Sequence, residues 1–177
     1  MATYLIVEAR LEAAVMRTLL EAADIQDVKV LSGEGKSSAL SLAKSIGLTR
    51  SENVAVLVDA DTMDARRIEE QYQAFTDLNG SADGFVRLFL AVPTLEEALF
   101  PDVETFCNIF KVALTGRQHA RFQTDRMSVI RSLLTIPGDG ETRIKPHARM
   151  DKEAAREGFG RPLLKELLSY LRQDSSK

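Results

Sequence analysis

The sequence is poor in residues that crosslink a chain or bind soft metals: it has one cysteine, two histidines and no tryptophan among 177 residues. A lone Cys107 excludes an internal disulfide and a cysteine-rich zinc site, and it is typical of a reducing, intracellular setting. No apolar run approaches the roughly 18 residues that a membrane-spanning helix needs. The first residues also lack the basic start and long apolar stretch of a signal peptide. These absences predict a soluble, cytoplasmic protein without a membrane partner.

Charge is unevenly distributed along the chain, although the net charge is only −3. Residues 1–110 carry nine Lys and Arg against eighteen Asp and Glu, a balance of −9. Residues 111–165 carry twelve against six, a balance of +6. An acidic part followed by a basic part is expected when one region holds cations and another attracts a polyanion. Solvated faces that merely differ in charge give the same pattern, so composition alone leaves both interpretations open.

Strand and helix patterns alternate over the first half of the chain. Short apolar runs predict four strands, at Tyr4–Val7, Val28–Leu31, Val54–Val58 and Phe85–Val92. Amphipathic spacing predicts the helices between them, at 9–23, at Ser37–Ile46 with Gly47 ending it, and at Asp64–Leu78. The unbroken apolar run Val54–Val58 indicates a central parallel strand that is covered on both faces. The alternation predicts an α/β fold with a four-stranded, mostly parallel sheet flanked by helices.

The pattern changes beyond Pro93. Apolar spacing there predicts helices alone, at Val103–Leu114, Met127–Leu134 and Leu163–Leu171. We therefore expect residues 1–93 to form an α/β core and residues 94–172 to form a mainly helical extension that packs on it. Residues 173–177 are expected to be a disordered tail.

Three carboxylates follow strands that the topology brings to one edge of the sheet. Glu8 follows the first strand, and Asp59 and Asp61 follow the third. Ligands of open parallel sheets bind beyond the carboxyl ends of the strands, and clustered carboxylates repel one another unless a proton or a cation intervenes. Oxygen ligands suit Mg²⁺, which takes one or two carboxylates with water and substrate phosphate. We therefore expect a magnesium site here, against the simpler interpretation that each acid is a solvated strand-end or capping residue.

The order of these motifs resembles the Toprim domain. Ile6-Val7-Glu8 precedes a helix, and Val56-Leu57-Val58-Asp59-Ala60-Asp61 follows a second strand–helix unit. Toprim proteins carry a Glu after the first strand and Asp-x-Asp after the third, and they include primases, topoisomerases and the overcoming-lysogenization-defect (OLD) nucleases. Over residues 4–93 the resemblance implies a Rossmann-like, mostly parallel sheet. It also implies nucleic-acid cleavage that depends on Mg²⁺, with Mn²⁺ as a substitute, and with Glu8, Asp59 and Asp61 as catalytic metal ligands.

A second acidic segment resembles the OLD-type nucleases in particular. Val92-Pro93-Thr94-Leu95-Glu96-Glu97-Ala98-Leu99 is similar to the segment that these enzymes carry after the fourth strand. The similarity makes Glu96 a candidate ligand of a second cation. Its neighbour Glu97 has a structural explanation instead, because Thr94 followed three residues later by Glu97 forms a capping-box pattern.

Basic side chains after residue 110 are candidates for contacts with a nucleic-acid backbone, which hold the chain without reading its sequence. OLD-type enzymes use a late Lys near the scissile phosphate, and we assign this catalytic role to Lys145, with Lys111 and Lys152 as alternatives. We expect DNA rather than RNA, although the sequence does not decide between them. The phosphate-contact candidates are Arg117, Arg121, Arg126, Arg131, Arg143, Lys145, Arg149, Lys152 and Arg156.

Gly35-Lys36-Ser37 matches only the end of a nucleotide-binding loop. That motif needs Gly at the position of Val30, which argues against a nucleoside triphosphatase. Lys36 remains a candidate for nucleic-acid contact because it opens a helix whose free N–H groups favour an anion. His119 and His147 lie in basic stretches that are more typical of exposed residues than of acid–base catalysts.

Two functions remain compatible with the sequence. The first is a metal-dependent nuclease that uses the acidic edge of the sheet. The second is a Toprim-like nucleic-acid-binding or regulatory subunit whose activity needs a partner protein. OLD-type nuclease domains usually accompany an ATPase, so the resemblance implies a separate ATPase subunit as a partner in a defence-type complex.

Overall fold

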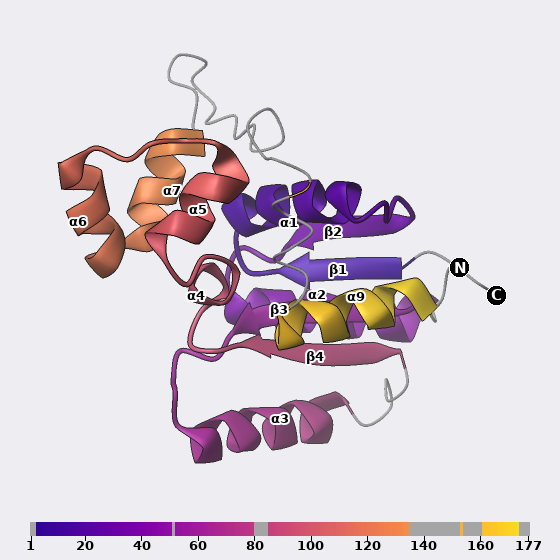
Figure 1. Ribbon diagram of the computed structural model, residues 1–177. Helices are drawn as coiled ribbons and strands as arrows, with labels where there is room; N and C mark the ends of the chain where they lie inside the picture. The colour runs from indigo at the N-terminus through magenta and orange to yellow at the C-terminus, as the bar shows by residue number, and fades with distance from the viewer. Residues whose placement is uncertain (1–2, 51, 80–84, 135–152, 154–160, 174–177) are drawn as a thin grey trace.

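The computed structural model describes residues 3–50, 52–79, 85–134, 153 and 161–173, and in this part of the chain four parallel strands form one sheet (Figure 1). The strands lie in the order β2-β1-β3-β4, and every pairing is parallel. Their bounds are β1 (Thr3–Val7), β2 (Val28–Ser32), β3 (Val54–Asp59) and β4 (Val86–Ala91). β3 lies between β1 and β4, which confirms the predicted α/β class and the central position of Val54–Val58.

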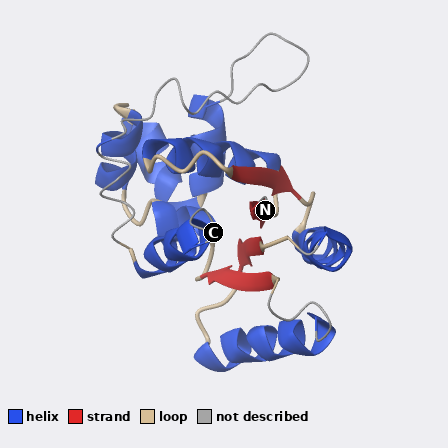
Figure 2. Cartoon of the chain, turned by 90° about the vertical axis from the view of Figure 1, so that its right-hand side faces the viewer, coloured by secondary structure: helices blue, strands red, loops and turns tan. Residues whose placement is uncertain are grey.

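Helices cover both faces of the sheet (Figures 1 and 2). One face packs against α2 (Lys36–Arg50) and α3 (Ala65–Asn79). The other face packs against α1 (Arg10–Ala22) and the helices that follow β4. No helix in the described part is both long and apolar enough to cross a membrane. The later helices are α4 (Leu95–Leu99), α5 (Val103–Phe110), α6 (Gly116–Thr124), α7 (Arg126–Leu134) and α9 (Pro162–Gln173).

Side chains that alternate along the strands pack into two apolar cores, one on each face of the sheet. Leu5 and Leu57 point to the core shared with α1 and α9, whereas Ile6 and Val56 point to the core shared with α2. The helices after β4 add an aromatic cluster in which the rings of Phe100 and Phe106 lie 5.5 Å apart, and those of Phe106 and Phe110 lie 4.9 Å apart. The sheet and the later helices therefore share one continuous apolar core.

Three predicted helix ends are wrong. α2 runs through Gly47 to Arg50, because a glycine inside a helix costs only about 1 kcal/mol and the neighbouring Ile46 is buried. α5 ends at Phe110 rather than at Leu114, since Lys111 adopts the left-handed conformation (φ 50°) that terminates helices. α9 extends through Gln173, and the remainder of the expected tail lies outside the described residues.

Gly33 determines how closely α2 approaches the sheet. Its N–H donates to the Val7 carbonyl at 2.8 Å, and a Cβ at this position would lie 2.3 Å from Ala39 Cα. We expect Gly33→Ala to lower the free energy of unfolding by about 2 to 3 kcal/mol in urea titrations, because backbone must move to make room. The control is Gly116→Ala in α6, where a Cβ meets nothing within 4 Å and no loss is expected. Equal stability of the two variants would contradict this account.

Candidate functional site

Glu8 and Asp59 lie together at the carboxyl edge of the sheet because β1 and β3 are neighbours. The Asp59 N–H donates to Glu8 Oε1 at 2.8 Å, although the two residues are 51 positions apart in the chain. Asp59 Oδ1 accepts a hydrogen bond from the Leu95 N–H at 2.7 Å, which ties the first turn of α4 to the same edge. Each of these contacts orients a carboxylate through one of its two oxygens.

Glu12 is a member of this acidic edge that the sequence reasoning missed. It lies on α1, four residues after Glu8, and only 8% of its surface is exposed. Glu12 Oε2 accepts hydrogen bonds from the N–H groups of Glu8 at 2.9 Å and Ala9 at 3.1 Å, which satisfies free donors at the start of α1. The signal in the sequence was a carboxylate four residues after Glu8 on the apolar face of an amphipathic helix.

Burial and mutual repulsion raise the pKa of two carboxyl groups at this edge. Loss of solvent raises the pKa of Glu12 to about 7, and the charges of Glu8 and Glu96 act in the same direction. The pKa of Asp59 also rises to about 7, first through loss of solvent and then through the charges of Glu96, Glu12 and Glu8. Hydrogen bonds from backbone N–H groups oppose both shifts. Glu8, Glu12, Asp59 and Glu96 are therefore one electrostatically coupled group, called the acidic cluster below.

The acidic segment after β4 divides its two glutamates between different roles. Thr94 caps α4, since its Oγ1 accepts from the Glu97 N–H at 3.4 Å. The Glu97 side chain does not return to the cap and instead lies 3.4 Å from an Arg126 nitrogen. Glu96 belongs to the acidic cluster, and its Oε2 is buried without a hydrogen-bond partner among the described residues. Glu96 is therefore the glutamate of α4 whose buried carboxylate oxygen is open to a cation.

Asp61 points away from the acidic cluster toward Lys36. Its φ of 55° lies in the left-handed region, so the alternation of the strand does not extend to it. Its N–H donates to the Pro93 carbonyl at 2.9 Å, and its carboxylate lies 3.1 Å from Lys36 Nζ. Lys36 Nζ also donates to the main-chain oxygen of Asp59. The Asp-x-Asp motif therefore places one carboxylate in the acidic cluster and the other against a lysine.

The acidic cluster has the donor chemistry of a site for a hard divalent cation, but it is not assembled as one here. Within the described ranges, no group of three or more His, Cys, Asp and Glu side chains is arranged to hold a metal ion. Glu8 and Asp59 each have a second oxygen beyond the one that a backbone N–H holds, and Glu96 Oε2 is buried and unpartnered. Clustered carboxylate oxygens suit Mg²⁺ or Mn²⁺, because a cation would relieve the repulsion between their charges.

Two of the predicted phosphate contacts are exposed on α6. Arg117 and Arg121 lie one turn apart on this helix, and Arg121 is 3.6 Å from Asp125. Arg126 has a different role, since only 16% of its side chain is exposed and its guanidinium lies over the Phe122 ring at 5.4 Å. Arg126 is a packing residue and does not belong to the phosphate-contact set. The expected exposure of His119, also on α6, is confirmed.

Most of the other basic candidates cannot be placed. Lys111 and Arg131 are exposed, at the end of α5 and on α7 respectively. The structure gives no position for the catalytic candidate Lys145. Outside the described residues lie Arg143, Lys145, His147, Arg149, Lys152 and Arg156.

Comparisons with known proteins bear on the fold. No protein-family description matches the chain. No curated protein matches it either. Among solved structures, the C-terminal region of the Burkholderia pseudomallei OLD protein is similar, with a TM-score of 0.52 at 17% identity, over 97% of this chain and 96% of that one. The chain therefore has the α/β fold of an OLD-type C-terminal region, as its Toprim motifs predicted.

Proposed function

We propose that the protein is a metal-dependent nuclease that cleaves a phosphodiester bond at the carboxyl edge of its sheet. The observation that carries the proposal is the acidic cluster, which gathers carboxylates from β3, α1, α4 and the residue after β1 at one place. Repulsion within this group disfavours full ionisation without a cation. The fold shared with the OLD C-terminal region supports a Toprim-type nuclease.

Glu8 and Asp59 are the residues that would hold Mg²⁺ or Mn²⁺, with Asp61 as a further ligand and Glu96 toward a second ion. A bound ion of this kind supplies Lewis-acid stabilisation of phosphoryl charge and lowers the pKa of a water molecule. The chain itself orients the ligands, because the N–H groups of Asp59 and Leu95 each fix one carboxylate oxygen. Glu12 holds the backbone at Glu8 in place from the buried side.

The basic part of the chain would hold the substrate. Arg117 and Arg121 on α6 are exposed for phosphate contacts. We extend this role to Arg143, Lys145 and Arg149, and we keep Lys145 as the proposed late catalytic lysine. Contacts of this kind are independent of sequence, and DNA is the proposed substrate.

Cleavage assays with the purified protein test the proposal. Supercoiled plasmid should be nicked or linearised with Mg²⁺ or Mn²⁺ and should stay intact with EDTA, because the carboxylates have no catalytic role without a cation. A parallel reaction on single-stranded RNA distinguishes the substrate classes. If the purified protein bound Mn²⁺ in calorimetry but cleaved neither plasmid nor RNA, the proposal of a nuclease that acts alone would be wrong.

One observation favours the alternative of a subunit that needs a partner. The acidic cluster is not arranged as a metal site in the described part of this single chain. A separate ATPase subunit, as the OLD relationship suggests, would then complete the site. Cleavage that appears only after the partner is added would support this second function.

A further inference from the structure

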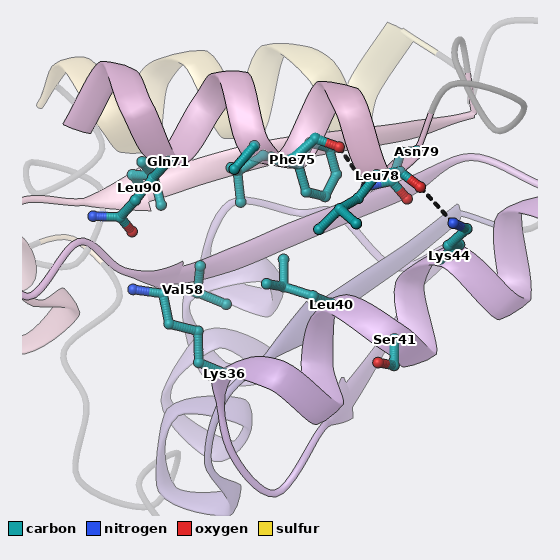
Figure 3. A pocket seen from close by; sticks show the side chains of 12 residues that line it. Lys36, Leu40, Ser41, Lys44, Val58, Gln71, Phe75, Leu78, Asn79 and Leu90 are labelled. Carbon is teal, nitrogen blue, oxygen red and sulfur yellow. Dashed lines mark hydrogen bonds between the residues drawn. The ribbon is translucent and has the colours of Figure 1, made fainter. Parts of the chain in front are cut away.

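Lys36 lies between the acidic edge of the sheet and a hollow on the sheet face. The hollow is a cavity of about 370 Å³ between α2 and α3, and Figure 3 shows Lys36 and Lys44 at its opposite ends. Lys36 Nζ donates to the Asp59 main-chain oxygen and lies 3.1 Å from Asp61 Oδ2. The side chain of Lys36 is 30% exposed, against 68% for Asp61. The ammonium group of Lys36 therefore already lies beside the Asp-x-Asp motif.

The backbone holds both members of this pair in place. The N–H of Gly35, which directly precedes Lys36, donates to the Glu8 carbonyl at 2.8 Å, and Gly35 has a φ of 121° that suits only glycine. Asp61 is fixed by the hydrogen bond from its N–H to the Pro93 carbonyl, in a left-handed conformation that aspartate adopts more readily than most residues other than glycine. Backbone hydrogen bonds therefore hold both residues at the carboxyl edge of the sheet, which distinguishes this pair from a contact between two mobile surface side chains.

Lys36 and a divalent cation compete for the same carboxylate. Lys36 Nζ contacts Oδ2 of the Asp61 carboxylate. A metal ion bound to the same carboxylate would lie close to the ammonium group, and the repulsion between the two positive charges favours displacement of the lysine. The displaced lysine would remain at the start of α2, where a positive side chain and free N–H groups favour a phosphate. We propose that Lys36 is an internal counter-ion of Asp61, exchanged by metal binding and then available to a substrate phosphate. This inference rests on the proposed function.

Metal affinity of lysine variants tests the exchange without any cleavage. Calorimetry with Mn²⁺ alone should show about tenfold tighter binding by Lys36→Met than by the wild type, because the competing charge is gone. Lys36→Arg keeps the charge and should bind Mn²⁺ about as the wild type does. Lys44→Met is the matched control, since Lys44 Nζ donates to the Leu78 main-chain oxygen at the other end of the cavity. Its Mn²⁺ affinity should not change.

A second measurement follows the displaced lysine. In Ca²⁺, which favours oxygen ligands, wild-type affinity for a short DNA duplex should rise above its value in EDTA, and Lys36→Met should lose about threefold or more of this gain. Wild-type protein that binds no Mn²⁺ would overturn the proposed function and this inference with it. Wild-type protein that binds Mn²⁺, together with a Lys36→Met variant whose affinity is unchanged or weaker, would overturn the exchange alone.

Discussion

Replacement of Asp59 by Asn is expected to slow metal-dependent cleavage at least about a hundredfold while the metal-free protein stays as stable as the wild type or becomes more stable. Cleavage falls because a neutral amide is a poor ligand for a hard cation. Stability is kept because the amide oxygen can still accept the Leu95 N–H, while the charge repelled by Glu96 and Glu12 disappears. The free energy of unfolding of Asp59→Asn should exceed that of the wild type at pH 8 by about 1 to 2 kcal/mol, because solvent screens part of the repulsion at this half-buried carboxylate.

Three measurements separate the two effects. Urea titrations in EDTA at pH 8 give the free energy of unfolding, calorimetry with Mn²⁺ gives the metal affinity, and a plasmid assay gives the cleavage rate. Asp64→Asn is a suitable control, because Asp64 is exposed and lies outside the acidic cluster. If Asp59→Asn strongly destabilised the metal-free protein, Asp59 would be a structural residue and the metal site would have to be sought elsewhere.

The metal-free protein should lose stability as the pH rises from about 4.5 to about 7. Glu12 has its pKa raised from 4.5 to about 7 in the folded protein, so the folded state holds a proton that the unfolded chain releases. The free energy of unfolding from this group is therefore largest below pH 4.5 and declines until the pH passes 7. Asp59, raised from 3.8 to about 7, acts in the same direction. The decline in the free energy of unfolding that comes from Glu12 is about 3 kcal/mol.

Glu12→Gln should flatten this pH profile because the amide does not titrate and can still accept the N–H groups of Glu8 and Ala9. Denaturation at a series of pH values in EDTA measures the effect, with Glu69→Gln on the exposed side of α3 as the control. Added Mg²⁺ should stabilise the wild type more at pH 8 than at pH 5, since metal and protons compete for the same oxygens. A wild-type profile that rises from pH 5 to pH 7 would contradict the account.

The sheet could be predicted because its strands are nearly all apolar. Val54–Val58 has no polar side chain, which is typical of a strand that is covered on both faces, and the structure pairs it with β1 and β4. Helix ends were harder to predict, because they depend on tertiary contacts. Nothing local in the sequence shows that α2 continues past Gly47 or that Lys111 turns into the left-handed region.

The site was predictable where strand topology determines it and unpredictable where single side chains do. Glu8 and Asp59 meet because parallel neighbouring strands end at the same edge. Glu12 was not predicted because a glutamate is normally exposed to solvent, and its burial on α1 depends on how the helix packs in the fold. Asp61 departs from strand alternation because of its left-handed backbone, and that conformation directs its carboxylate to Lys36.

The position of α9 has a consequence for how the protein is made on the ribosome. The Tyr170 ring lies 5.7 Å from that of Phe89. Leu164 and Leu167 belong to the core, and their helix α9 packs on β3 and β4. These residues emerge after all four strands have been synthesised, so the part of this sheet face over β3 and β4 lacks the cover of α9 until translation has passed that helix. Exposed apolar strands of this kind are prone to aggregation. A nascent chain that stalls before α9 is therefore expected to be a substrate for chaperones, and residues 1–93 expressed alone should be recovered mainly from the insoluble fraction.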